Sequence, residues 1–223
     1  SSAASDVYKR QSRLLEGSNE KKNPQDFALW KNANESHIMK WHSPWGYGFP
    51  GWHIECSAMS HKYLGEKFDI HGGGIDLKFP HHDCEIAQSE SVYGENPANF
   101  WIHTNMLTLN GKKMSKSIGN SVFPNEIFEG KNSIFSKSFS PMTLKFFMYQ
   151  AHYRNTLDLS NTALLASEKA FEKIAQLSTD LQSVKVSDSS DLNANDWIIS
   201  CYNSLNDDFN SPKLIACFFE LNK

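Results

Sequence analysis

Residues 68–90 read FDIHGGGIDLKFPHHDCEIAQSE, and the change of pattern along this stretch decides the fold. Residues 68–71 are typical of a short strand, residues 72–74 of a glycine turn, and residues 82–93 of a helix. Strand patterns return within residues 101–109. A strand, a glycine turn, a helix and another strand predict an α/β unit.

The second half of the chain has a different character and predicts helices. From about Pro141 it is rich in Ala, Leu, Ser, Lys and Glu, and Ser140 is a candidate N-cap before a helix over residues 141–154. Further helical patterns cover residues 196–205 and 212–221, after a polar loop at 183–195. A helix over residues 161–182 would carry one apolar stripe, formed by Leu164, Phe171, Ile174 and Leu181.

Composition excludes several classes of protein. The 223 residues carry 22 Lys+Arg and 25 Asp+Glu, a net charge of −3, so no basic excess points to a nucleic-acid partner. Apolar residues make up 39%, enough for a packed core, yet no apolar run is long enough to span a bilayer. The four cysteines form no C-x-x-C pair and no signal peptide is visible, which predicts a reduced, cytoplasmic protein without a membrane partner.

One group of residues has the chemistry of a metal site. His81 and Glu85 are four residues apart and share one face of a helix, while Cys56 lies on a different element. Sulfur, nitrogen and oxygen donors together suit zinc. A surface His–Glu pair beside a buried cysteine would give the same spacing, and spacing leaves His71, His82 and Cys84 open as competing ligands.

Three other segments have weaker signals. The glycines of residues 71–76 would let a backbone approach phosphate, or form a tight turn. The lysines of residues 112–120 would stabilise phosphate charge, or form an exposed turn after the Asn110-Gly111 dipeptide. Five aromatic residues either wall a small pocket or form the core of an irregular loop: Trp41, Trp45, Tyr47, Phe49 and Trp52.

The order of these motifs resembles cysteinyl-tRNA synthetase, a class I aminoacyl-tRNA synthetase. GWHIECSAM at 51–59, the stretch at 68–90 and KMSKS at 113–117 carry the resemblance, which covers roughly residues 20–222. KMSKS alone would indicate only the class, whereas the first two segments are specific to the cysteine enzyme. The resemblance implies an α/β fold: the C-terminal half of a class I Rossmann-like catalytic domain, followed by an α-helical stem-contact and bundle region.

The resemblance also implies a zinc ion that binds the thiolate of the substrate L-cysteine. Cys56, His81 and Glu85 match its ligands, and the family's fourth protein ligand is an upstream cysteine that this chain lacks. Zinc prefers a soft thiolate to a hydroxyl, which would separate cysteine from serine. By the same resemblance the substrate cysteine is bound by Trp52, His71 and Asp76.

KMSKS implies ATP as a second substrate, together with Mg²⁺. Lys116 would bind the triphosphate and stabilise charge as pyrophosphate leaves, and Lys113 would assist it. The expected reaction is attack of the cysteine carboxylate on the α-phosphate, which gives cysteinyl-adenylate, and then transfer to tRNA(Cys). The expected protein is a monomer.

Some of the family pattern is not present. The chain has no His-x-Gly-His motif, and Phe49 stands where many relatives have Arg. We therefore expect a fragment that lacks the N-terminal part of the enzyme and is inactive alone. The expected divisions are a non-native segment at 1–11, part of the catalytic domain at 12–125, a helical stem-contact region at 126–182, and the truncated start of a tRNA-binding bundle at 183–223.

Two other functions compete with this interpretation. The cysteine ligase of mycothiol synthesis shares the fold and the zinc-bound cysteine but uses an amino-sugar acceptor. A non-catalytic zinc-binding module is the second alternative. The helical region after KMSKS favours the tRNA enzyme, because it resembles the stem-contact and helical segments of the synthetase.

Overall fold

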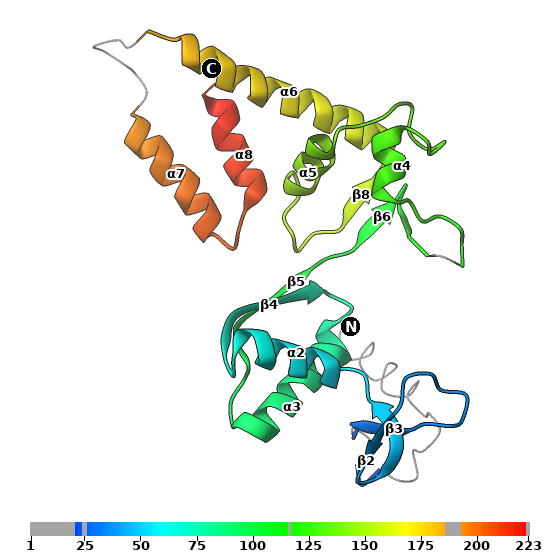
Figure 1. Ribbon diagram of the computed structural model, residues 1–223. Helices are drawn as coiled ribbons and strands as arrows, with labels where there is room; N and C mark the ends of the chain where they lie inside the picture. The colour runs from blue at the N-terminus through cyan, green and yellow to red at the C-terminus, as the bar shows by residue number, and fades with distance from the viewer. Residues whose placement is uncertain (1–20, 24–25, 116, 186–192, 222–223) are drawn as a thin grey trace. The chain divides into compact units, whose positions relative to one another are not determined.

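A computed structural model describes residues 21–23, 26–115, 117–185 and 193–221 (Figure 1). The chain divides into two compact units. Unit 1 contains the described residues up to Ile70 together with Phe79–Phe100, and unit 2 contains His71–Lys78 and the described residues from Trp101 onward. This division rests on compactness, so the predicted functional boundaries near residues 125 and 182 stay predictions.

Unit 1 combines a small antiparallel sheet with two helices. The sheet has the order β1-β3-β2, formed by Trp30–Asn32, Gly46–Pro50 and Trp41–Ser43. Helices α2 (Ile54–Leu64) and α3 (Asp83–Tyr93) pack against each other. The prediction of a helix at 82–93 is confirmed, and α3 ends where Gly94 adopts a left-handed φ of 81° and donates its N–H to Glu90 O.

Four of the five predicted aromatic residues lie on this sheet or in the turn between β2 and β3, and Trp52 follows β3. Trp41, Trp45 and Tyr47 are exposed, because the described part of the chain leaves the small sheet uncovered on that side. Phe49 is partly buried and stacks on His37 with ring centroids 4.9 Å apart. The exposure of Trp41, Trp45 and Tyr47 does not fit the core of a loop, and the aromatic pocket stays a prediction.

The glycine run belongs to a strand, not to a turn. Strand β4 extends over Phe68–Gly74 and pairs with β5 (Ala98–Thr104). The turn comes one step later, where Leu77 N–H donates to Gly74 O at 2.9 Å. An irregular helical turn, η2 (Lys78–His82), then leads into α3. Pairing with β5 fixes the extended conformation, which local glycine content alone predicted as a turn.

A second sheet lies at the centre of unit 2. Its order is β7-β6-β8, formed by Lys112–Lys113, Leu107–Leu109 and Leu157–Leu159, and β6 pairs with β8 in parallel. The predicted Asn110-Gly111 turn joins β6 to β7 with positive φ angles of 49° and 75°.

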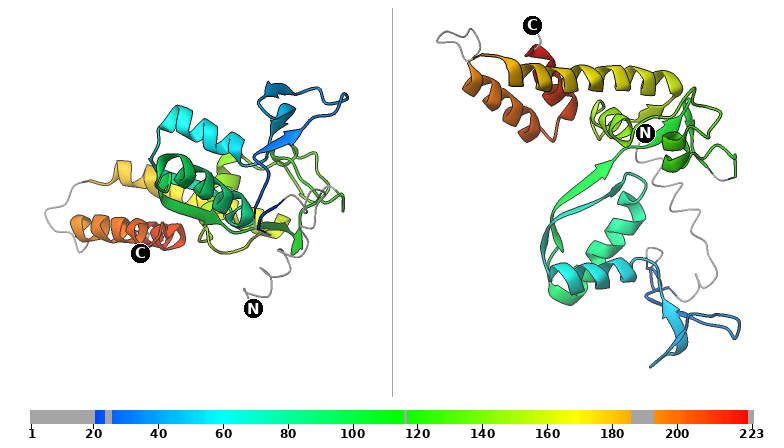
Figure 2. Two further views of the ribbon diagram at one scale, coloured as in Figure 1. Left: turned by 90° about the horizontal axis from the view of Figure 1, so that it is seen from below. Right: turned by 45° about the horizontal axis from the view of Figure 1, so that its top comes forward.

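Helices make up most of the rest of unit 2 (Figure 2). The four predicted helices are present, and the bundle begins with a short additional helix. Ser140 Oγ accepts the N–H of Thr143, so Ser140 is the N-cap that the sequence predicted. Ser160 Oγ accepts the N–H of Ala163 and caps α6 in the same way. The bounds are α4 (Pro124–Glu129), α5 (Pro141–Tyr149), α6 (Asn161–Ser183), α7 (Ala194–Asn206) and α8 (Ser211–Glu220).

Helix α5 ends five residues before its predicted end at 154, where the chain turns and makes an ionic contact. Arg154 Nε donates to Asp208 Oδ2 at 2.5 Å, and Tyr153 OH donates to Asp208 Oδ1 at 2.5 Å. Asp208 and Phe209 both have left-handed φ angles, 53° and 54°, in the connection between α7 and α8. This contact joins the end of α5 to the helical hairpin.

The hydrophobic core of unit 2 includes part of the segment between α4 and α5, residues 130–140. Phe135 and Phe139 from that segment are 5% and 2% exposed. The apolar stripe of α6 is buried at its beginning, where Leu164 is fully covered, but Leu181 is half exposed. No helix in the described ranges has both the length and the apolar content needed to cross a membrane. The core residues are Leu109, Ile127, Phe135, Phe139, Leu144, Phe147, Leu159 and Leu164.

Candidate active site

The structure brings the three predicted metal ligands together in unit 1. Helix α2 carries Cys56, the turn η2 carries His81, and the first turn of α3 carries Glu85. One donor atom from each lies within 4.8 Å of the others. His81 and Glu85 are buried, at 6% and 2% exposed, and Cys56 is partly buried. We call these three residues the donor cluster.

A second histidine orients the ring of His81. His81 Nε2 lies 2.9 Å from Glu85 Oε1, whereas His81 Nδ1 lies 2.7 Å from Nδ1 of the buried His53. One of the two Nδ1 atoms must donate and the other accept. His81 that binds a metal through Nε2 carries its proton on Nδ1, so it would donate to His53.

Burial favours the uncharged forms of the donor cluster. It raises the pKa of Glu85 to about 7 and lowers the pKa of His81. It also raises the pKa of Cys56, and the charges of Glu85 and Glu55 raise it further. A divalent cation would reverse this preference, because it stabilises the thiolate and the carboxylate that bind it.

The donor set and its size fit one zinc ion. Bonds of about 2.0–2.3 Å place two donors on the same zinc at most about 4.6 Å apart. The 4.8 Å limit on the three donor atoms is close to that value. The three donor atoms therefore lie close enough to one another to share a single ion. Within the described part of unit 1, this is the one set of three His, Cys, Asp or Glu donors that comes this close, and Cys84 belongs to no such set. His82 stays open as a competing ligand.

Within unit 1, the predicted substrate-binding residue Trp52 lies beside the donor cluster. Its ring stacks on His53 with centroids 5.0 Å apart and is 4.9 Å from the ring of His81. The indole is 61% exposed, so its free face is open to a ligand. The other two residues belong to unit 2, where His71 stacks on Trp101 at 4.6 Å and Asp76 is exposed in the turn after β4.

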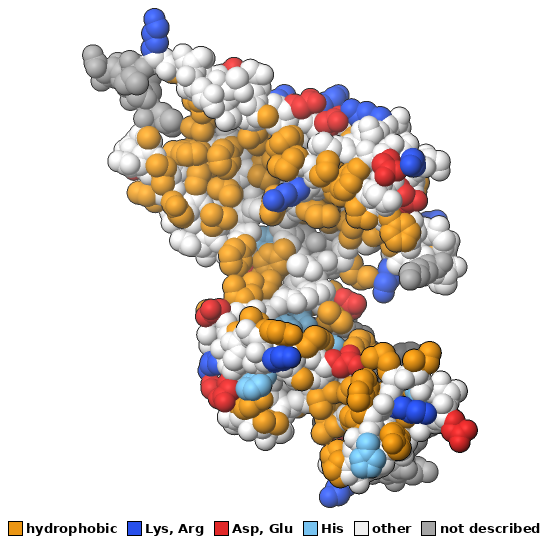
Figure 3. Space-filling model, viewed as in Figure 1, with side chains coloured by type: hydrophobic (Ala, Val, Ile, Leu, Met, Phe, Trp, Pro, Cys, Tyr) orange, Lys and Arg blue, Asp and Glu red, His pale blue; other side chains and the backbone are white. Residues whose placement is uncertain are grey.

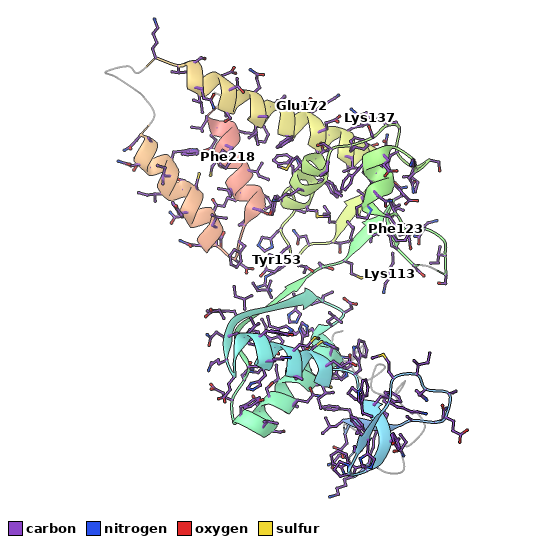
Figure 4. The ribbon with its side chains drawn as sticks, in the orientation of Figure 1. Lys113, Phe123, Lys137, Tyr153, Glu172 and Phe218 are labelled. Atoms are coloured by element: carbon purple, nitrogen blue, oxygen red, sulfur yellow. The ribbon has the colours of Figure 1, made fainter. Side chains whose placement is uncertain are left out.

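The predicted ATP-binding lysines lie in unit 2, on the loop that follows the β6–β7 hairpin. Lys113 is exposed at the end of β7 (Figure 4), and Lys116 lies outside the described residues. Asn120 closes this loop: its Oδ1 accepts the N–H of Ser115 at 2.8 Å, and its Nδ2 donates to Lys113 O at 3.0 Å. We call residues 111–120 the lysine loop.

A carboxylate on β8 holds the start of the lysine loop. Asp158 Oδ1 accepts from Thr108 Oγ1 and from Gly111 N–H, both at 2.6 Å. These hydrogen bonds lower the pKa of Asp158. Sequence reasoning missed Asp158 and Asn120, and it also missed His53. For His53 a signal was available, since it stands within the GWHIEC segment that carries Cys56.

Comparison with known protein families gives one match over most of the chain. The family model described as "tRNA synthetases class I (C) catalytic domain" matches residues 3–169. The chain is also 53% identical over 220 residues to the "Cysteine--tRNA ligase" of Cytophaga hutchinsonii, and 51% identical over 208 residues to that of Porphyromonas gingivalis. These alignments cover 95% and 93% of the chain but only 44% and 42% of the relatives.

Solved structures include a more distant likeness. The LeuRS of Agrobacterium radiobacter K84, in a ternary complex with tRNA and LeuAMS, aligns with a TM-score of 0.54 and 14% identity. The alignment covers 82% of this chain and 29% of that one. At this identity the likeness shows the fold alone, and it agrees with the predicted α/β class.

Proposed function

The chain belongs to the family of class I (C) tRNA synthetase catalytic domains, and from this we propose that it forms part of a cysteine–tRNA ligase. The reaction would use ATP to activate L-cysteine as cysteinyl-adenylate and then transfer the cysteinyl group to tRNA(Cys). The chain spans less than half the length of the ligases it matches, so the proposal concerns the protein that contains it.

The observation that carries the proposal is the convergence of Cys56, His81 and Glu85 on one buried point. A bound zinc ion would supply a soft Lewis acid that prefers a thiolate to a hydroxyl. His53 would hold the His81 ring in the tautomer that leaves Nε2 free to bind, and the exposed face of Trp52 would cover the substrate side chain.

The lysine loop would act on the other substrate. Lys113 and Lys116 would bind the phosphates of ATP and stabilise the charge that develops as pyrophosphate leaves. Asn120 supports this role because its side chain bonds to Lys113 O and to the N–H of Ser115, and so fixes the backbone beside Lys113. The step needs positioned charge more than a protein nucleophile.

Amino-acid-dependent exchange of pyrophosphate into ATP tests the proposal on the complete enzyme that contains this chain. We expect exchange with cysteine and loss of that exchange after removal of zinc. Exchange with serine should be at least about 100-fold slower, because the metal must distinguish the sulfur of cysteine from the oxygen of serine. A Lys116→Ala variant should lose exchange and keep its zinc, whereas Lys131→Ala, an exposed lysine after α4, should keep both.

Three outcomes would overturn parts of the proposal. Zinc binding without cysteine-dependent exchange would indicate a binding module. Exchange with cysteine but transfer to an amino sugar and not to tRNA(Cys) would indicate the mycothiol ligase. Equal exchange with cysteine and serine would remove the proposed role of the donor cluster in substrate selection.

A further inference from the structure

The helical hairpin at the end of unit 2 places two thiols face to face. Helices α7 and α8 pack against each other and are joined by the short connection at 207–210 (Figure 1). Trp197, Cys201 and Ser204 follow at spacings of four and three residues, so they form one face of α7. We call this the thiol face of α7.

Cys217 of α8 lies against that face. Trp197 Nε1 donates to the backbone oxygen of Cys217 at 2.9 Å, and Ser204 Oγ is 3.9 Å from Cys217 Sγ. The ring of Trp197 also meets that of Phe218 edge-on, with centroids 5.4 Å apart. The contacts of Trp197 and Ser204, which lie on either side of Cys201 along α7, therefore place Cys217 opposite it.

The two thiols differ in access to solvent. Cys217 is buried, at 8% exposed, whereas Cys201 is partly exposed. Hydrophobic side chains gather over the helices of unit 2 on the face shown in Figure 3. An oxidant would reach Cys201 first, and Cys217 would be shielded from reagents but not from Cys201.

We propose that Cys201 and Cys217 form an oxidisable pair, which glutathione disulfide converts into a disulfide bond between α7 and α8. This modification site is independent of the proposed ligase reaction, because none of its residues belongs to the donor cluster or the lysine loop. The other two cysteines, Cys56 and Cys84, belong to unit 1 and serve as internal references.

The reaction has two balanced steps. The thiolate of Cys201 attacks one sulfur of glutathione disulfide, and one glutathione leaves as a thiolate. The thiolate of Cys217 then attacks Sγ of Cys201 in this mixed disulfide, and the second glutathione leaves. In sum, two protein thiols are oxidised to one disulfide and glutathione disulfide is reduced to two glutathione molecules. The two glutathione thiolates take up the two protons that the cysteines release.

The environment makes the reduced pair slow to react. Burial raises the pKa of Cys201, and its neighbours Cys217 and Glu220 add to the rise. Less thiolate is then present at neutral pH, which slows the first attack. A disulfide needs its Cβ atoms about 3.8 Å apart. Because α7 and α8 already pack against each other around these residues, we expect the bond to need a rearrangement of side chains and not a separation of the helices.

Trypsin offers a direct test, because it cuts after Lys185 and Lys213 and so separates the two cysteines into peptides 186–213 and 214–223. The chain is incubated with glutathione disulfide, its free thiols are blocked with N-ethylmaleimide, and the digest is analysed by mass spectrometry without reduction. We expect the two peptides joined to each other, with a loss of about 2 Da for the bond, and separated again by dithiothreitol. Cys56 and Cys84 should carry the blocking group.

Matched variants make the result decisive. Cys84→Ser should keep the joined peptides, whereas Cys217→Ser should stop at glutathionylated Cys201. Cys201→Ser, at the more exposed position, gives a second variant if Cys217→Ser fails to fold, and it should leave Cys217 unmodified. Three results would overturn the proposal: glutathionylated Cys201 beside an alkylated Cys217 in the unaltered chain, no reaction at either thiol, or a disulfide between two chains.

Discussion

The donor cluster of unit 1 and the lysine loop of unit 2 are held in opposite ways. In the cluster, buried side chains contact one another: His53 meets His81, and His81 meets Glu85. In the loop, Lys113 is exposed and Lys116 lies outside the described residues. The loop is held by hydrogen bonds from the Asn120 side chain to backbone groups.

The difference matches what each region is proposed to bind. A metal ion with short, directed bonds needs donors fixed by close packing and by partners behind them. A triphosphate is a large, diffuse charge, and a loop that carries ammonium groups can close over it. Substitutions in the lysine loop should therefore alter nucleotide chemistry without a change in zinc affinity, whereas substitutions in the donor cluster should lower zinc affinity first and exchange as a consequence.

Removal of a donor should have the largest effect. Cys56→Ser replaces the soft sulfur ligand by a hydroxyl, and we expect zinc affinity to fall by more than the loss of about 10–100-fold that is typical when a supporting residue is removed. Competition with a chromophoric chelator measures the affinity. Cys201→Ser is the matched control, since it removes a thiol from unit 2. Equal affinity in the Cys56 variant would exclude Cys56 as a ligand.

The support behind the donors gives the next effect. His53→Ala removes the group that faces His81 Nδ1, and zinc affinity should fall by about 10–100-fold. His53→Asn should recover part of this loss, because the amide oxygen can accept the same proton and Asn tolerates the left-handed φ of 82°. His42→Ala, on an exposed position of β2, is the control. If the Ala and Asn variants have the same zinc affinity, the hydrogen bond between residue 53 and His81 does not support zinc binding.

Asn120→Ala should affect the loop and spare the cluster. It removes two hydrogen bonds of about 1 kcal/mol each, so cysteine-dependent pyrophosphate exchange in the complete enzyme should slow by about 5–30-fold. Zinc affinity should be unchanged. Asn125→Ala, on the exposed side of α4, serves for comparison. A fall in zinc affinity together with exchange would break the separation between the two regions.

The smallest effect should come from the charge of Asp158. Its folded pKa lies below the unfolded value, so its contribution to the free energy of unfolding is present above about pH 4 and is lost as the pH falls through the folded value. The stability difference between the unaltered chain and Asp158→Asn should thus be constant from pH 8 to 5 and shrink below 4. Urea unfolding at each pH measures it, with Glu172→Gln on α6 as control. A difference that grows on acidification contradicts the assignment.

Sequence patterns predicted the elements that local chemistry decides. The helices of unit 2 follow from apolar periodicity and from caps such as Ser140, and the Asn110-Gly111 turn follows from its dipeptide. Spacing along the helix predicted that His81 and Glu85 share one face. Cys56 joined them because its sulfur suits zinc, but spacing left His71, His82 and Cys84 open, and only the resemblance to a family singled out the set. No local rule relates residues on separate elements.

The features that the sequence did not predict depend on contacts between distant residues. The glycines of β4 are extended because β5 pairs with them. Phe135 and Phe139 enter the core from a segment without periodicity. His53 and His81 are 28 residues apart, and nothing in the pattern of either indicates that their rings meet.

The parallel pairing of β6 with β8 has a consequence for synthesis of the chain. Gly111, at the start of the lysine loop, depends on Asp158, which follows 47 residues later. At about 5–20 residues per second, the ribosome needs roughly 2–9 s to add them. During that interval the nascent hairpin that carries Lys113 has no strand beside it, and its edge is open to other partners. The residues between Gly111 and Asp158 thus set how long a chaperone has to bind that edge before β8 covers it.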